Sequence, residues 1–184
     1  MAAFERAEPV DELEVLLTQD RLAGALRSRG LPDDLDESLR LRTHVLNERI
    51  RIEGPIHADV LTAMNNLAWV RIERGEWKPA ETLLLRAKDL AEQLDASNYE
   101  VAILRTSLAE IQSKRGRFDL AEPEYLAGIE MLRQYELDDS LCNSVTRYAM
   151  ELERHDRFDD AEIWFEKSIE YRGRFFGIDH PATL

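Results

Sequence analysis

The sequence predicts an all-α fold, an α-solenoid of about eight helices, because its residues repeat with a period of 40 to 41. A segment that combines a turn residue, an aromatic residue and an Ala-Glu pair occurs three times, at residues 75–81, 116–122 and 156–162. A small residue recurs at Ala68, Ala109 and Ala149, and a polar residue recurs at His57, Asn98, Asp139 and His180. A period of 20 to 50 residues is typical of repeat architectures.

The first predicted helix pair occupies residues 9–56 and follows a lead-in, residues 1–8, that we expect to be disordered. Pro9 opens the first helix, and the acidic residues of the first turn suit the positive end of the helix dipole. Gly30 then ends this helix. The pair departs from the repeat pattern, with Arg42 at a position that elsewhere is apolar. Because terminal units of solenoids are often atypical, we interpret it as a divergent capping pair.

Three regular units follow at residues 57–97, 98–138 and 139–177. In each, an apolar-striped first helix ends in basic residues and a turn residue, which together are a typical stop signal. The second helix begins near the aromatic residue, and Pro79 falls in its opening turn, where a missing N–H costs little. Residues 178–184 read as the start of a further first helix. We therefore expect that the array continues beyond them or that a second copy covers this end.

Small residues recur because two antiparallel helices approach closely only where one of them presents a small side chain. The alanines should therefore lie at helix crossings, and the aromatic residues should fill the gap beside each tight turn. Enlarging one of these alanines, as in Ala121→Phe, would overpack the crossing at a cost of about 1–3 kcal/mol. The predicted structural signature consists of Ala68, Gly75, Trp77, Ala80, Ala109, Gly116, Phe118, Ala121, Ala149, Phe158 and Ala161.

This pattern resembles the tetratricopeptide repeat, and more narrowly the repeats of the kinesin light chain type. The order of small residue, glycine, aromatic residue and Ala-Glu carries the resemblance, with the long period, the run at 64–68 and the joint at 177–181. Asp156 departs from it by replacing the turn glycine. The resemblance implies a right-handed superhelix whose first helices line a concave groove for segments of other proteins. Its groove residues here would be Thr62, Asn65, Trp69, Glu73, Thr106, Glu110, Ser113, Asn143, Thr146 and Met150.

Two of these groove positions leave alternatives open. The Trp69 indole, on an otherwise polar helix face, could anchor a ligand side chain, or it could pack against a neighbouring repeat. The Asn65 amide could grip a ligand backbone or bond the neighbouring helix.

Composition excludes several classes of function. The formal net charge of −13 argues against nucleic acid and favours a protein or peptide partner with a basic segment. The single cysteine, Cys142, allows no intrachain disulfide, and the N-terminus does not read as a signal peptide. No apolar run is long enough to span a bilayer. We therefore expect a cytoplasmic protein with no membrane or nucleic-acid partner.

The sequence offers no catalytic, cofactor or metal-binding pattern. The histidines fall on different units, and the two at joints, His57 and His180, are most simply interpreted as caps of turns. We predict a non-catalytic interaction scaffold that binds a partner segment in its concave groove, without a cofactor or metal. The alternative is a regulatory or oligomerisation arm of a larger signalling protein, such as a kinase or ATPase, that acts through its edges or ends. Self-association would then use the C-terminal end.

Overall fold

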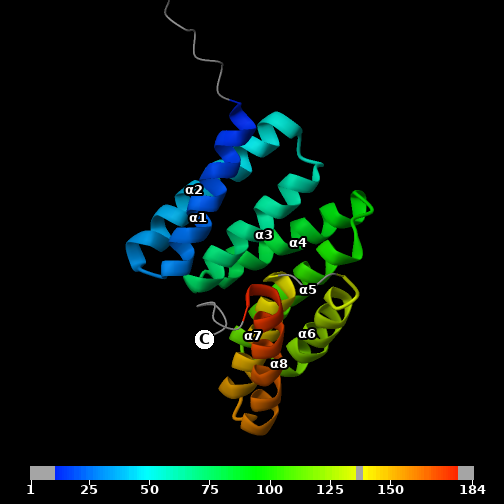
Figure 1. Ribbon diagram of the computed structural model, residues 1–184. Coiled ribbons are helices and arrows are strands. Elements are labelled where there is room, and N and C mark those ends of the chain that lie inside the picture. The colour runs from blue at the N-terminus through cyan, green and yellow to red at the C-terminus, as the bar shows by residue number, and fades with distance from the viewer. Residues whose placement is uncertain (1–10, 136–138, 178–184) are drawn as a thin grey trace, which may run out of the picture. The chain divides into compact units, whose positions relative to one another are not determined.

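The computed structural model describes residues 11–135 and 139–177, and Figure 1 shows their arrangement along the chain. Regular structure in these ranges is entirely helical, which confirms the predicted all-α class and the expected number of about eight helices. The predicted lead-in at 1–8 and the predicted helix start at 178–184 lie outside the described residues. The helices are α1 (Glu12–Arg29), α2 (Pro32–Glu53), α3 (Ala58–Glu73), α4 (Trp77–Gln93), α5 (Asn98–Lys114), α6 (Phe118–Leu132), α7 (Asp139–Arg154) and α8 (Phe158–Phe176).

The chain divides into two compact units, Met1–Glu76 and Trp77–Leu184. In the N-terminal unit α2 contacts both α1 and α3. In the C-terminal unit the contacts join α4 to α5, α5 to α6, α6 to α7, and α7 to α8, and α5 also contacts α7. The predicted repeat at 57–97 spans the division, and the repeat boundaries stay a prediction. None of the described helices combines the length and the apolar character that crossing a membrane requires.

The capping pair of the N-terminal unit buries polar groups at positions that are apolar in the other repeats. The Arg42 side chain is 7% exposed, and its Nη1 donates to Asp20 Oδ1 at 2.8 Å. Burial lowers the pKa of Arg42, because the charged guanidinium loses its hydration there, while the Asp20 carboxylate partly offsets that effect. Ser38 is fully buried, and its hydroxyl donates to the carbonyl of Ala23 at 2.7 Å. The ion pair between Arg42 and Asp20 thus explains how this helix pair departs from the repeat pattern and still packs.

The tight turns have the same backbone conformation in all three regular copies. Gly75, Gly116 and Asp156 have φ of 75°, 74° and 59°, the left-handed region that suits glycine and that aspartate adopts more easily than most residues. After each turn residue, the next N–H donates to a carbonyl five residues earlier, at 2.8, 3.0 and 3.0 Å. The aspartate at 156 therefore replaces the turn glycine without changing the turn.

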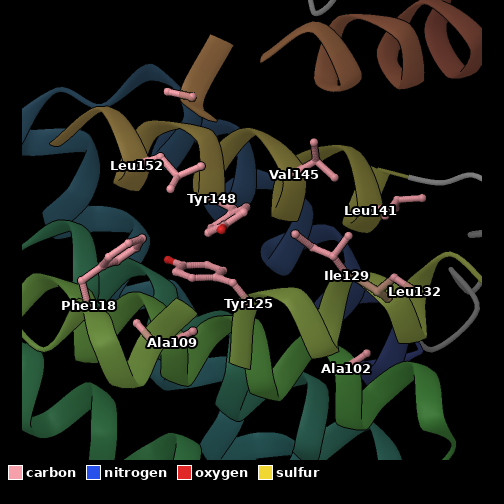
Figure 2. Close-up of a cluster of buried hydrophobic side chains, with 12 residues drawn as sticks. Ala102, Ala109, Phe118, Tyr125, Ile129, Leu132, Leu141, Val145, Tyr148 and Leu152 are labelled. Atoms are coloured by element: carbon pink, nitrogen blue, oxygen red, sulfur yellow. The ribbon is translucent and has the colours of Figure 1, made fainter. Parts of the chain in front are cut away.

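The core of the C-terminal unit forms where α5, α6, α7 and α8 meet around two tyrosines (Figure 2). Tyr125 of α6 is fully buried, Tyr148 of α7 is 2% exposed, and their ring centroids are 5.6 Å apart. Gly128 faces α5 so closely that an added Cβ would lie 2.6 Å from Thr106 Cγ2. All six signature alanines are buried, none more than 3% exposed, as close helix contacts require: Ala68, Ala80, Ala109, Ala121, Ala149 and Ala161.

The signature aromatics differ in exposure, and neighbouring helices explain the difference. Phe118 is 9% exposed because the rings of Tyr148 and His155 stack on it, with centroids 6.5 and 4.4 Å away. Phe158, at the equivalent position of α8, is 60% exposed, and Trp77 is 38% exposed. The turn alone does not bury the aromatic residue; for Phe118, Tyr148 of α7 and His155, which directly follows α7, complete its cover.

Candidate binding site

The residues predicted to line a groove on α5 and α7 belong to two helices that contact each other in the C-terminal unit. On each helix they recur at spacings of three and four residues, which places them on one helix face. Thr106, Glu110 and Ser113 of α5 are 3 to 5% exposed. On α7, Asn143 and Thr146 are half-buried and Met150 is 49% exposed. The α5 positions are thus largely enclosed, whereas the α7 positions reach the surface.

A polar cluster, which we call the Glu151 cluster, joins the two helices. Lys114 Nζ lies 2.8 Å from Glu151 Oε1 and 3.2 Å from Glu110 Oε1, so one ammonium bridges two carboxylates. The hydroxyl of Ser113 donates to the other oxygen of Glu151, and Arg154 Nη1 lies 3.5 Å from Oε1. The side chains of Glu110 and Glu151 are 6% and 2% exposed, so the bonds of this cluster replace the water that both carboxylates have lost.

The tyrosine core is bonded to the same cluster through Tyr125. The Tyr125 hydroxyl donates to Glu110 Oε2 at 2.7 Å. Burial raises the pKa of Tyr125 well above its usual value, and the Glu110 carboxylate adds to this effect by disfavouring a second negative charge. The phenol therefore stays protonated and remains a hydrogen-bond donor. Glu110 is held from α6 as well as from its own helix.

A second group of side chains, which we call the Arg172 cluster, lies between α7 and α8. Arg172 donates to Asn143 Oδ1 at 3.0 Å and to Thr146 Oγ1 at 3.2 Å, and Asn143 donates to Asp139 Oδ2 at 2.8 Å. The Thr146 hydroxyl also lies 2.6 Å from that of Ser168. Two predicted groove residues are therefore brought together by an arginine that the prediction did not include.

The predicted groove residues of α3 belong to the N-terminal unit. Thr62 is exposed, Asn65 is 8% exposed, and Trp69 is half-buried. Glu73 pairs with Arg27 of α1 at 2.5 Å. Burial of the Asn65 side chain suits the interpretation in which its amide serves the protein itself, and the ligand role of Trp69 stays a prediction.

Glu151 is the important residue that the prediction missed, although the repeat held a signal for it. Measured from the turn residues, Glu151 stands where the two preceding repeats carry Val70 and Ile111, which are both fully buried. A carboxylate at a position that is apolar in sister repeats needs buried partners. Those partners are Arg154, one turn later on the same helix, and Lys114, on the neighbouring helix α5.

A cavity of about 480 Å³, lined by both apolar and charged side chains, lies between α4, α5 and α6. Leu85, Leu104, Leu108 and Leu120 line its walls. By helix spacing, its α5 residues lie on the face opposite to Glu110 and Ser113. The cavity is therefore separate from the polar α5–α7 face.

Comparison with protein families gives two matches with the same description. A tetratricopeptide repeat model matches residues 14–93, and a second tetratricopeptide repeat model matches residues 149–182. Together the two matches cover more than half of the chain. Among curated proteins, none matches the sequence significantly.

Solved structures with similar folds include proteins from two organisms. Two crystal structures of a putative kinesin light chain from P. anserina with nearly identical TPR-like repeats are each 15% identical to the chain. Each match covers 95% of this chain and 82% of the other chain, with TM-scores of 0.63 and 0.64. The structure of BtubC (BKLC) from P. vanneervenii is 17% identical, covers 95% of this chain and 77% of its own, and has a TM-score of 0.60. At this identity the likeness concerns the fold.

Proposed function

Because the chain belongs to the tetratricopeptide repeat family, whose members generally act as protein-interaction scaffolds, we propose that it binds a partner peptide or protein segment without catalysis. The expected resemblance to kinesin light chain repeats is confirmed in the fold. The proposed binding surface is the α5–α7 face, formed by the predicted groove positions of these two helices and the Glu151 cluster.

The observation that carries the proposal is a pair of exposed side chains next to the Glu151 cluster. Met150 is 49% exposed and the Arg154 side chain is 49% exposed, one helical turn apart on α7. Glu151, next to Met150 in the chain, forms an ion pair with Lys114 of α5. An exposed apolar side chain beside a cation offers a partner one packing contact and one hydrogen-bond donor on a preorganised surface.

The chemistry of the partner follows from charge. The formal net charge of −13 attracts a segment that carries basic residues, and this steering acts before contact. At the surface, the half-buried amide of Asn143 and hydroxyl of Thr146 are bonded to Arg172, so we propose that a peptide backbone binds there by replacing some of these hydrogen bonds. We propose an extended or helical segment with flanking lysines or arginines.

Catalysis forms no part of this proposal. Lys114 forms an ion pair with Glu110 and another with Glu151, so we assign these three side chains a structural role between α5 and α7. We also propose a cytoplasmic location, in keeping with a single buried cysteine, Cys142.

A peptide-display selection against the whole chain supplies a partner peptide, whose affinity is then measured by fluorescence anisotropy. We expect Met150→Ala to weaken binding about fivefold or more, because a central apolar contact is removed. Leu126→Ala is the matched control: Leu126 is 39% exposed on α6 and outside the α5–α7 face. Binding that survives Met150→Ala but is lost with Leu126→Ala would place the site elsewhere.

A second candidate function, an arm that acts through its edges or ends, is favoured by the outer face of α8. Phe158 and Ile169 lie 11 residues apart, on one face of the helix, and are 60% and 57% exposed. Phe165 between them is half-buried. In repeat proteins the next unit normally covers such a face. In this second candidate function, a second copy or another part of a signalling protein covers it.

Light scattering of the purified chain tests this second candidate. A dimer that becomes a monomer with Ile169→Lys, while Ile163→Lys leaves it intact, would support association through the outer face of α8. Ile163 is a suitable control because it is 51% exposed on the same helix but lies away from that face. A monomer at every concentration would reject self-association.

A further inference from the structure

The joint between α2 and α3 brings three potential metal ligands together in the N-terminal unit. Glu53 ends α2, His57 precedes α3, and Asp59 lies in the first turn of α3. One ligand atom from each lies within 4.8 Å of the others. This joint has no part in the proposed partner site.

Glu53 points a buried, unpaired oxygen into this group. Its side chain is 10% exposed, and Oε1 accepts from Arg49 at 2.8 Å. The other oxygen, Oε2, is buried and accepts no hydrogen bond from the described residues. It lies 3.5 Å from His57 Nδ1. A buried carboxylate oxygen without a donor is costly, so it marks a place where a cation would be stabilised.

The imidazole of His57 lies beside that oxygen and also caps α3. His57 Nδ1 accepts the backbone N–H of Asp59 at 3.2 Å, and this hydrogen bond caps α3. Nδ1 and Glu53 Oε2 are thus two potential ligand atoms that lie 3.5 Å apart. An imidazole nitrogen and a carboxylate oxygen are both ligands that zinc accepts.

We propose that Glu53, His57 and Asp59 bind a zinc ion through one nitrogen and two carboxylate oxygens, with water completing the site. Zinc takes such ligands at about 2.0–2.2 Å in a tetrahedral arrangement, whose ligand-to-ligand edges are about 3.4 Å. The 3.5 Å between Glu53 Oε2 and His57 Nδ1 matches that edge. The 3.9 Å between His57 Nδ1 and Asp59 Oδ2 needs a small closure, which the half-exposed aspartate side chain can make.

Two features of the joint limit the affinity. Arg49 Nη1 lies 2.8 Å from Glu53 Oε1 and 2.6 Å from Asp59 Oδ2, so its charge opposes a second cation. The lone pair of His57 must also leave the Asp59 N–H when it binds the metal. Zinc binding should therefore loosen the cap, and removing Arg49 should strengthen zinc binding.

The test uses the full chain without an affinity tag, and zinc chloride titrated in competition with a chromophoric chelator. We expect one zinc ion per chain and a rise in the thermal unfolding midpoint, since binding to the folded state stabilises it. Cobalt in place of zinc should give the visible absorption of a four-coordinate site. A wild-type chain that binds no zinc would overturn the proposal.

Variants identify the ligands. His57→Asn keeps a side-chain cap for Asp59 while it removes the imidazole, and Glu53→Gln keeps the shape of the buried carboxylate. Each should weaken zinc binding at least about tenfold. Arg49→Gln, checked for folding by circular dichroism, should bind zinc more tightly than the wild type.

His44→Asn is the matched control, because His44 is an exposed imidazole on α2 away from the joint. It should leave zinc binding unchanged. Equal zinc binding by the wild type and His57→Asn would mean that other carboxylates hold the ion, and would overturn the proposal. Partner binding by these variants should match the wild type, which separates this test from that of the α5–α7 face.

Discussion

Replacing Glu151 with alanine tests whether the Glu151 cluster holds α5 and α7 together. The substitution removes a carboxylate whose side chain is 2% exposed and leaves Lys114, 18% exposed, without its nearer partner. Removing one member of a buried ion pair costs about 3–5 kcal/mol. Lys114 keeps Glu110 at 3.2 Å, so we expect the lower end, about 3 kcal/mol.

Urea unfolding followed by circular dichroism measures this loss. For a chain of this size, about 3 kcal/mol corresponds to a fall of about 6–12 °C in the thermal midpoint. Glu153→Ala is the control, since it removes an exposed carboxylate from the same helix and should change stability by no more than about 0.5 kcal/mol. A loss below about 1 kcal/mol for Glu151→Ala would refute the reasoning.

A double-mutant cycle separates the pair from simple loss of packing. Lys114→Met and Glu151→Met remove the charges but keep most of the volume. Because the two groups are in contact at 2.8 Å, we expect a coupling energy of about 1–3 kcal/mol. Additive single effects would show that each side chain acts independently of the other.

Two further predictions follow from the core. Phe118→Ala should lower the free energy of unfolding, measured by urea titration, by about 3–5 kcal/mol. Phe158→Ala, at the equivalent but 60% exposed position, should lower it by less than about 1 kcal/mol. Equal losses would contradict the explanation that α7 supplies the cover. Burial raises the pKa of Tyr125 and of Tyr148, so the folded state favours the neutral phenols. Their contribution is fully present below about pH 10, the ordinary tyrosine value, and is lost as the pH rises further. Urea midpoints measured from pH 8 upward should fall above pH 10, and less steeply with Tyr148→Phe; parallel pH profiles would contradict this.

The repeat period predicted most of the fold because it reports geometry that every unit shares. The left-handed turn at Asp156 and the buried alanines could be placed by counting from one copy to the next. Counting from one copy to the next could not predict how exposed the aromatic residues are. Their exposure depends on whether a following helix covers the position, as α7 covers Phe118, and one unit's sequence does not contain that information.

The geometry of the proposed binding face was predicted less completely, for a related reason. The spacing identified the helix faces that carry Glu110 and Asn143, but not how deeply a neighbouring helix encloses them. Glu110 is 5% exposed because α6 and α7 both reach it, through Tyr125 and, by way of Lys114, through Glu151. Such contacts join residues that no helical spacing relates. A charged residue at an apolar repeat position is the signal that could have revealed them.

Hydrogen–deuterium exchange of the chain with and without its selected partner peptide tests the proposed binding surface most directly. The account predicts slower exchange in α5 and α7, strongest around Met150, with α6 and the outer face of α8 unchanged. Protection confined to α6 or α8, with α7 exchanging as in the unbound chain, would contradict it.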